Sequence, residues 1–435
     1  MNFATTAFLV RWRWWMCILA LVVGEVLIMW GYVLRRPYTE IDFSTYMEQV
    51  ALVEAGERRY DLIRGAQGPL VYPAGFVWLY RGLSWVTEGG AKIRRAQNIF
   101  AGLFVVDSFV ASLVYKYAYQ EDPEKWKSLL VALIASSRRA HSVYALRLFN
   151  DGPCATLCHC AIFFLVSDFQ YVACVLFSLA VSVKMSALLF APAWYVVMAS
   201  KKGHGSALRG VLLCAFVQIF VALPFLFADP QAYVRNAFDV SRGFKHKWSV
   251  NFKWVPCAQS LKETDLRDCD GPFSSSFFKL LLLGLHALAL VLLAHFRWRL
   301  HCKGRFLGLF DFFQLRFDPR IQYTKKAVIV MLCSCNFVGI AFARSLHFQF
   351  CVWYLKTLPL LVFSTRLPLL LKIALLVAIE AAWNPWQGQS STIASSLLLT
   401  ASHAILFFAL LRKPDVPDFS LIPQKPRTTG KKKIT

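Results

Sequence analysis

The chain has 435 residues, of which 57% are hydrophobic and 15% aromatic, and it carries a formal net charge of +23. A soluble protein would hold more charge and less apolar content, and the apolar stretches do not alternate as the strands of an outer-membrane barrel do. The composition therefore predicts an all-α polytopic membrane protein. The positive charge points to anionic membrane lipids or phosphate-bearing lipids and not to nucleic acid, because no soluble domain is evident.

The first apolar run, residues 16–34, follows Arg11 and Arg13 and lacks a small-residue cleavage site. It predicts an uncleaved signal anchor with a cytosolic N-terminus. About twelve apolar segments are expected, of which the fourth to sixth are short enough to be broken or re-entrant helices. An even number of spans places both termini in the cytosol. The expected segments are 14–34, 97–117, 128–147, 154–168, 171–183, 185–199, 207–228, 276–296, 326–343, 349–364, 367–384 and 393–411.

This pattern predicts one transmembrane catalytic domain over residues 1–411, with a first lumenal loop at 35–95, and a cytosolic basic tail at 412–435. The tail ends in "GKKKIT", and Lys432 and Lys433 occupy the fourth and third positions from its end. That placement resembles the dilysine retrieval signal of endoplasmic-reticulum membrane proteins. The alternative is a basic tail that simply lies beside anionic lipids.

The first lumenal loop contains "TEIDF", in which Glu40 and Asp42 are two residues apart. On an extended segment the two acids share a face, while Ile41 and Phe43 anchor the loop in the membrane surface. A membrane enzyme that transfers a sugar from a lipid phosphate needs a carboxylate as general base for the acceptor hydroxyl. The alternative is that one acid caps a helix that begins near Ser44.

Such an enzyme also needs cationic groups that stabilise the departing lipid phosphate. Lys184 stands alone in an apolar run, where a charge is a functional candidate, although snorkelling to the surface is the alternative. Arg147 either reaches lipid headgroups or contacts a phosphate. In "ARSLHFQF", Arg344 and His347 are three residues apart, so one helical face would present both beside Gln349.

Two other stretches offer contacts for sugars and for a diphosphate. In "RLFNDGP", Asn150 and Asp151 are candidates for binding sugar hydroxyls, although Asp151 equally reads as a helix N-cap before an early proline. The basic and aromatic segment at 235–254 is either interfacial or the site of the acceptor's diphosphate and sugar rings. Its candidate contacts are Arg235, Arg242, Lys247 and Trp248.

The sequence gives little support for a metal. "CATLCHC", residues 154–160, resembles a metal cluster, but it lies in an apolar run, where cysteines are more often small hydrophobes of the core. Cys257 and Cys269 flank a polar loop and would form a disulfide if that loop is lumenal. A cationic clamp makes a divalent metal unnecessary for phosphate, so we expect metal independence and no cofactor.

Six segments appear in order over residues 35–365 and resemble the signatures of one family. They are "TEIDFSTYMEQV", "GPLVYPAGFVWLY", "RLFNDG", "SVKMSALLFAP", "NAFDVSRGFKHKWSVNFKW" and "FARSLHFQFCVWYLKTLP". The family is that of the dolichyl-phosphate-mannose-dependent α-1,3-mannosyltransferases of asparagine-linked glycosylation. The chain departs from its pattern at Phe43, at Gly152 in "NDGP" and at Phe348.

The resemblance implies a C-type glycosyltransferase membrane fold, with interfacial helices in the first loop, in the endoplasmic reticulum. It implies inverting transfer of mannose from dolichyl-phosphate mannose to the five-mannose dolichyl-diphosphate-linked oligosaccharide. It also implies a base in the first loop, for which Asp42 is favoured over Glu40. The alternatives are a sister C-type transferase with another acceptor or a glucose donor, and a lipid or metabolite transporter.

Overall fold

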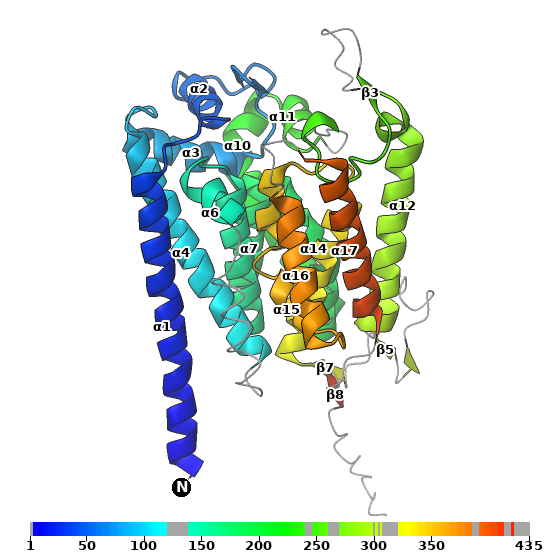
Figure 1. The fold of residues 1–435 in the computed structure, drawn as a ribbon. Helices are drawn as coiled ribbons and strands as arrows, with labels where there is room; N and C mark the ends of the chain where they lie inside the picture. The colour runs from blue at the N-terminus through cyan, green and yellow to red at the C-terminus, as the bar shows by residue number, and fades with distance from the viewer. Residues whose placement is uncertain are drawn as a thin grey trace, which may run out of the picture.

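The computed structural model of the chain describes residues 3–119, 138–239, 246–259, 269–298, 301–302, 305–306, 321–384, 391–412 and 419–421. These residues form a bundle of roughly parallel helices with several short helices gathered at its upper end in Figure 1. The N-terminus lies at the lower end of the first helix, which runs along one edge of the bundle.

Six helical segments of the described part are long and apolar enough to cross a membrane, by length and composition. At 1.5 Å per residue, their 18 to 26 residues reach about the 30 Å thickness of a hydrocarbon core. The expectation of an all-α polytopic membrane protein is therefore confirmed, while the expected count of about twelve spans is not. The six lie in α1 (Phe3–Arg35), α4 (Ile93–Ala118), α10 (His204–Ala228), α12 (Ser276–Leu292) with its π-helical continuation η4 (Leu293–Arg297), α14 (Lys325–Phe342) and α17 (Ile393–Leu411).

Shorter helices complete the bundle beside these long ones. The expected break in the middle of the chain is found at Lys184, which separates one apolar helix from a 3-10 turn and the helix that follows it. The shorter helices are α6 (Arg138–Ala145), α7 (Asp151–Val166), α8 (Gln170–Val183), η1 (Met185–Phe190), α9 (Ala191–Lys202), η5 (Phe348–Trp353), α15 (Leu358–Phe363) and α16 (Leu369–Trp383).

The expectation of one continuous apolar segment at 349–364 is wrong. The chain forms the 3-10 helix η5, turns over residues 354–357, and starts again as α15 with Pro359 in its first turn. Proline fits the first turn of a helix but not its interior, so it favours a new start there. The turn carries Lys356, which is buried and bonded to α4.

The upper end of the bundle is built largely by the first loop. It contains α2 (Phe43–Glu54), the β1–β2 hairpin (Arg64–Gly65 and Gly68–Pro69) and α3 (Ala74–Thr87), and α11 (Pro230–Ala237) lies beside them in Figure 1. The rings of Tyr46, Phe76 and Tyr80 pack against one another in a second hydrophobic core that is distinct from the core of the bundle. This aromatic core holds the start of α2 over the bundle.

α14 is the central helix of the larger core, because its residues from Ala327 to Ile340 are all buried. Small side chains such as Ser334, Cys335 and Gly339 let neighbouring segments approach it closely, and a Cβ on Gly339 would lie 2.5 Å from Leu189. The Trp298 indole at the end of η4 donates to Ser334 on α14 at 2.9 Å.

The remaining elements are short and lie at the two ends. At the upper end are η2 (His246–Trp248), the antiparallel pair β3 (Ala258–Gln259) and β4 (Cys269–Asp270), and η3 (Pro272–Ser274). At the lower end are the pairs β5 (His301–Cys302) with β6 (Arg305–Phe306) and β7 (Ile321–Tyr323) with β8 (Phe419–Leu421). Cys257, next to β3, is disulfide-bonded, and the expected partner Cys269 lies where side chains are not described.

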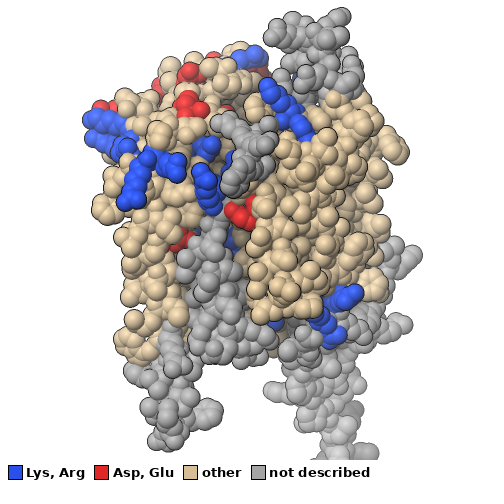
Figure 2. Space-filling view, in the orientation of Figure 1, with Lys and Arg blue, Asp and Glu red and all other residues tan. Residues whose placement is uncertain are grey.

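Figure 2 shows where charge lies on the face drawn in Figure 1. Lys and Arg side chains lie mainly at the upper end, a smaller group lies at the lower right, and most side chains in the broad band between them are uncharged. The exposed apolar residues of α10 and α12, such as Phe216, Phe220, Phe277 and Leu280, belong to the long membrane-crossing helices. This pattern suits a protein whose apolar middle band contacts lipid and whose charged residues lie outside that band.

Candidate active site

Asp42 lies at the start of α2, in the N-cap position, but its side chain does not cap the helix. Its Oδ2 instead accepts a hydrogen bond of 3.3 Å from the hydroxyl of Tyr46, one turn further along α2. The Tyr46 hydroxyl also lies 3.4 Å from that of Tyr72, which follows the β1–β2 hairpin. Asp42 is thus turned inward, toward the aromatic core of the first loop.

Glu40 takes the structural role that the sequence left open between the two acids. Its Oε1 accepts from both the backbone N–H and the hydroxyl of Ser44, each at 3.1 Å, and its other oxygen is bonded to the hydroxyl of Tyr38. Glu40 is exposed, and it satisfies a free N–H at the beginning of α2. The expected shared face of the two acids is therefore not found, because a bend separates them and the helix begins directly after Asp42.

The surroundings of Asp42 change how readily it holds a proton. Burial raises the pKa of the Asp42 carboxyl, and the nearby Lys184 ammonium and the Tyr46 hydroxyl oppose that rise. The carboxylates of Asp151 and Glu40 add smaller effects that raise it further. A carboxyl with a raised pKa is a better proton acceptor than an exposed aspartate, provided that it stays ionised.

Lys184 and Asp151 form a buried ion pair beneath Asp42. The Lys184 Nζ lies 2.8 Å from Asp151 Oδ1 and donates to Asn150 Oδ1 at 3.1 Å. Asp151 is the first residue of α7, and Lys184 follows the last residue of α8, so a helical hairpin brings the two together. The N-cap interpretation of Asp151 is wrong, because Asn150 holds that position and makes no side-chain cap bond.

Trp353 also contacts Asp151 directly. Its indole N–H donates to Asp151 Oδ1 at 2.6 Å. The other oxygen, Oδ2, is buried and has no hydrogen-bond partner among the described residues. A buried carboxylate oxygen without a donor is costly in a finished protein core, so this oxygen is available to a substrate hydroxyl.

Three aromatic rings surround the ammonium of Lys184. Its Nζ lies 5.4 Å from the ring centre of Tyr72, 5.0 Å from that of Phe350 and 5.7 Å from that of Trp353. Ring faces attract a cation, so these rings add to the stabilisation that the Asp151 carboxylate gives the buried ammonium. Tyr72 touches both Lys184 and Tyr46, and through Tyr46 it joins the ion pair to Asp42.

A second cationic group forms on the ring of Phe348. The guanidinium carbons of Arg139 and Arg147 lie 4.9 Å and 5.1 Å from its centre. Burial and the neighbouring Arg139 lower the pKa of Arg147 to about 10. Arg147 bonds the Ser142 hydroxyl, but no carboxylate within the described ranges pairs with it, and its Nε is buried without a partner. Two adjacent guanidinium groups make a site suited to an anion.

His347 and Gln349 lie close to this group, whereas Arg344 does not. The His347 Nδ1 lies 2.7 Å from Gln349 Oε1, and burial lowers the pKa of the imidazole against the influence of that bond. The expectation that one helical face presents Arg344 and His347 is wrong, because both lie in the irregular segment between α14 and η5. Arg344 turns to η3, where it donates to the Phe273 carbonyl at 3.2 Å and lies over the Phe273 ring.

The four candidates from the basic and aromatic segment fall in different places. Trp248 is partly exposed, its ring centre lies 6.3 Å from that of His347, and Lys247 is stacked on it at 5.0 Å. Arg235 is exposed in the last turn of α11, and no bond joins it to the residues around Asp42. Arg242 lies outside the described residues.

The sequence missed several members of this arrangement. Tyr46, Tyr72 and Trp353 touch predicted residues, and Arg139 shares the Phe348 ring with the predicted Arg147. Only Arg139 had a visible signal, as a charge inside a segment expected to be apolar. Aromatic residues are too common in a membrane protein to stand out by type. Their role depends on contacts between segments more than 20 residues apart.

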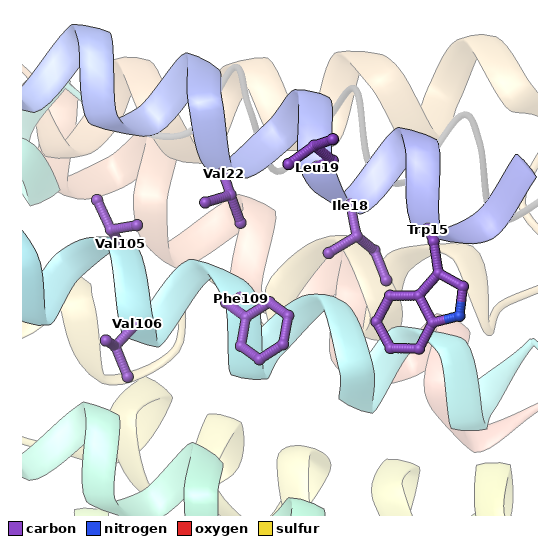
Figure 3. Close-up of a pocket in the computed structure, with 7 residues that line it drawn as sticks. All are labelled: Trp15, Ile18, Leu19, Val22, Val105, Val106 and Phe109. Atoms are coloured by element: carbon purple, nitrogen blue, oxygen red, sulfur yellow. The ribbon is translucent and has the colours of Figure 1, made fainter. Parts of the chain in front are cut away.

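Two other features of the described residues offer no catalytic group or metal site. An apolar pocket of about 340 Å³ lies between α1 and α4 (Figure 3), and its lining of aliphatic and aromatic side chains suits hydrocarbon and offers no reactive group. The described residues contain no group of three or more His, Cys, Asp or Glu placed to hold a metal ion, and Cys154, Cys158 and Cys160 are free thiols. The pocket is lined by Trp15, Ile18, Leu19, Val22, Val105, Val106 and Phe109.

Residues 19–396 match the family model described as the ALG3 protein. The chain belongs to this family. A member from Arabidopsis thaliana is 36% identical over 416 residues, and the match covers 92% of this chain and 89% of that protein. Members from Mus musculus and Homo sapiens are 36% and 37% identical, covering 93% and 91% of this chain and 88% and 86% of theirs. All three bear the name Dol-P-Man:Man(5)GlcNAc(2)-PP-Dol alpha-1,3-mannosyltransferase.

Among solved structures, the chain is similar to ArnT from Cupriavidus metallidurans bound to undecaprenyl phosphate. The two are 14% identical, the match covers 90% of this chain and 76% of that one, and the TM-score is 0.40. The part of the chain that matches the ALG3 family model includes α2, the α7–α8 hairpin and η5. The family resemblance expected from the sequence signatures is therefore confirmed.

Proposed function

We propose that this protein transfers mannose from dolichyl-phosphate mannose to the five-mannose dolichyl-diphosphate-linked oligosaccharide, forming an α-1,3 linkage. One observation carries the proposal: relatives that match about nine-tenths of the chain at 36–37% identity bear the name of this reaction. The cluster of Asp42, Asp151 and Lys184 at one end of the bundle supplies groups suited to it. The multi-pass helical body suits two substrates that both carry an isoprenoid tail.

Asp42 is the general base of this proposal. It takes the proton from the acceptor's 3-hydroxyl while that oxygen attacks the anomeric carbon of the donor mannose. The bond between that carbon and the phosphate oxygen breaks, and dolichyl phosphate leaves with the bonding pair. One displacement at a β-linked donor gives the α-linked product, so no covalent sugar–enzyme intermediate is needed. Glu40 is the weaker candidate, because its carboxylate already holds Ser44 and Tyr38.

Lys184 supports the base by its charge. The ammonium stays bonded to Asp151 and Asn150, and from there it opposes the rise that burial imposes on the pKa of Asp42. The ammonium therefore favours the ionised form of the base, which burial disfavours. A direct contact of Lys184 with the donor phosphate, expected from the sequence, would use its remaining N–H.

The leaving phosphate is assigned to Arg147 and Arg139, with His347 beside them. Two guanidinium groups on one ring neutralise the charge that develops as the phosphate departs, and preorganised donors of this kind are effective away from water. Arg147 has unused bonding capacity on its buried Nε. Because these cations stabilise the leaving group, we propose that the reaction needs no metal ion.

The sugars are assigned to groups on both sides of this centre. Asp151 Oδ2 is free to accept a sugar hydroxyl, and Asn150 lies beside it. Trp248 presents a partly exposed ring next to His347, which suits stacking on a sugar of the acceptor, with Lys247 close enough to meet its diphosphate. Gln349 orients His347, and Arg235, Arg242 and Arg344 remain weaker candidates for acceptor contacts.

We also propose that the protein resides in the endoplasmic-reticulum membrane, with the upper end of Figure 1 in the lumen and both termini in the cytosol. Support comes from the chain itself. The first loop lies at the upper end, as does β3, which directly follows the disulfide-bonded Cys257, and disulfides persist in oxidising compartments such as this lumen. The N-terminus lies at the opposite end. The dilysine sequence at 432–433 falls outside the described residues.

The direct test uses purified full-length protein in detergent with dolichyl-phosphate mannose and the five-mannose acceptor lipid. The expected product carries one more mannose, which an α-1,3-specific mannosidase releases. Cells that lack the protein are expected to accumulate the five-mannose lipid. Accumulation of a larger species would instead identify a sister transferase, and binding or flux of either lipid without product would identify a transporter.

A further inference from the structure

A buried polar cluster lies below the candidate active site, inside the bundle, and the proposed reaction does not use it. Its centre is Asp107 on α4, whose side chain is fully surrounded by protein. Three groups bond it: His159 Nδ1 at 2.6 Å, Lys356 Nζ at 2.8 Å and the Tyr144 hydroxyl at 2.9 Å. Charged residues within membrane segments are costly and are retained for a purpose, so this cluster calls for a function.

Lys356 is held entirely by this cluster. Besides Asp107, its Nζ bonds the Ser108 hydroxyl at 2.9 Å and the Phe104 carbonyl at 3.3 Å, so each ammonium hydrogen has an acceptor. The ammonium also lies 3.8 Å from the ring centre of Phe104. No hydrogen of the Lys356 ammonium is therefore left for a substrate.

The first connection from Asp107 to the candidate site runs through Tyr144. The Tyr144 hydroxyl lies 2.9 Å from Asp107 Oδ2 and 3.0 Å from the carbonyl of Gly152, the residue after Asp151. The ring packs so closely on the first turn of α7 that a Cβ on Gly152 would lie 2.9 Å from it. Tyr144 therefore fixes the start of the helix that carries Asp151.

The second connection runs through the turn that follows η5. Lys356 anchors this turn to α4, and Trp353, three residues earlier, donates its indole N–H to Asp151. Bonds from Tyr115 to the Lys356 carbonyl at 2.7 Å and from Asn336 to the Trp353 carbonyl at 2.9 Å hold the backbone between them. A shift of Lys356 would therefore be passed to Trp353 and to Asp151.

We propose that Asp107 is a positioning residue, which fixes Asp151 and, through it, the ammonium of Lys184 by these two connections. It touches no substrate. Its effect is on where Lys184 stands relative to Asp42, and that consequence for catalysis rests on the function proposed above. The groups that face Asp42 are Tyr38, Glu40 and Tyr46 from its own loop and helix, Tyr80 from α3, Asp151 from α7 and Lys184.

The decisive variant is Tyr144→Phe, which removes the hydroxyl of the first connection and keeps the ring. The first readout is the rate of acylation of Lys184 by acetic anhydride, followed by mass spectrometry, with the exposed Lys202 as internal reference. We expect several-fold faster labelling of Lys184 in Tyr144→Phe and in Asp107→Asn than in the wild type. Tyr117→Phe, which loses a bond with Ser167 elsewhere on α4, is the matched control and should label at the wild-type rate.

The second readout is the acid limb of the pH–rate profile. Tyr144→Phe should move this limb toward higher pH, in the same direction as Lys184→Met but by less, because a displaced ammonium supports the Asp42 carboxylate less well. Unchanged Lys184 labelling in folded Tyr144→Phe, or a lower rate with an unmoved limb, would overturn the proposal. If Asp107→Asn does not fold, Tyr144→Phe and Trp353→Phe still test the proposal, because each breaks one of the two connections and can be measured by the same labelling. Absence of product from the wild type would reject the proposed function. The labelling rates would then still test whether Asp107 positions the Lys184 ammonium.

Discussion

Lys184 Nζ and Asp151 Oδ1 lie 2.8 Å apart at the ends of two consecutive helices, and both side chains are buried. The Asp151 carboxylate compensates the charge of Lys184, which would be unfavourable alone in an apolar run, and it fixes the position of the ammonium in the candidate site. Snorkelling of Lys184 to the membrane surface, the alternative that the sequence allowed, is excluded by this burial. The ion pair also explains why "RLFNDGP" and "SVKMSALLFAP" are both needed to assemble the centre.

Replacement of Asp42 tests the base. We expect Asp42→Asn to lower turnover by at least 100-fold, because general-base catalysis contributes about 10²–10⁴-fold. The amide keeps the shape and can still accept from Tyr46, so the protein should fold and bind dolichyl phosphate. Glu40→Gln is the matched control, and its turnover should stay within a few-fold of the wild type. Near-normal turnover in Asp42→Asn would transfer the role to another carboxylate.

The pH dependence of the reaction follows from the surroundings of Asp42. Burial raises the pKa of this carboxyl, and the base works only when ionised. Activity should therefore fall as the pH is lowered through that raised pKa, at a higher pH than the value near 4 of an exposed aspartate. Lys184→Met removes the opposing ammonium and should move the acid limb to still higher pH. An unmoved limb in that variant would separate Lys184 from the base.

The two stacked arginines should decide how well the donor phosphate is held. We expect Arg147→Gln to reduce kcat/KM for dolichyl-phosphate mannose by about 10–100-fold, as for the loss of a hydrogen bond of about 1.5–3 kcal/mol to a charged group. Arg147→Lys should recover part of this loss, because lysine restores the charge but lacks the planar set of N–H donors with which a guanidinium binds phosphate. Arg81→Gln, on the exposed side of α3, should leave the kinetics unchanged. Equal losses in both glutamine variants would point to general surface charge.

Gly152 offers a test of packing without any change of charge. An added Cβ would meet the Tyr144 ring at 2.9 Å, so we expect Gly152→Ala to lower the free energy of unfolding by about 1–3 kcal/mol. Gly102→Ala, in a stretch of α4 with nothing within 4 Å, should be neutral or slightly stabilising. Thermal unfolding in detergent measures both. Equal Tm values would show that Tyr144 can move aside.

Metal independence is the simplest prediction to measure. Turnover in excess EDTA should equal turnover in added Mn²⁺ or Mg²⁺, because the leaving phosphate is assigned to guanidinium groups and not to a cation held by carboxylates. The same assay with Arg147→Gln shows whether added metal compensates for the lost charge. Strong inhibition by the chelator, reversed by Mn²⁺, would contradict the assignment.

Much of this arrangement was predictable from sequence, and the limits have a physical cause. Apolar length predicted the long helices, and the break at Lys184 followed from the shortness of the segments around it. Which of Glu40 and Asp42 bonds the first turn of α2 was not predictable, since it depends on which residue begins that helix. The pairing of Arg344 with His347 failed because residue spacing assumes a helix, and that segment is irregular.

The partners of the charged residues were also beyond the sequence. No feature of the sequence near Lys184 identifies Asp151 as its counter-ion, because the two residues are 33 positions apart, at the start and just after the end of the α7–α8 hairpin. Arg139 was visible as a charge but had no role until Phe348, more than 200 residues away, was placed beside it. Contacts of this kind arise from packing and leave no local pattern.

The hairpin of α7 and α8 also bears on how the chain enters its membrane. A lone lysine or aspartate costs about 2.5–3.5 kcal/mol at the centre of a helix that passes from the translocon into lipid, and a charge at a helix end still adds to the cost where that end lies within the bilayer. Because Asp151 opens α7 and Lys184 closes α8, the two charges arrive at the same end of one hairpin and can neutralise each other during insertion. The ion pair thus lowers the free-energy cost of inserting these two helices together, and it does so before any substrate is present.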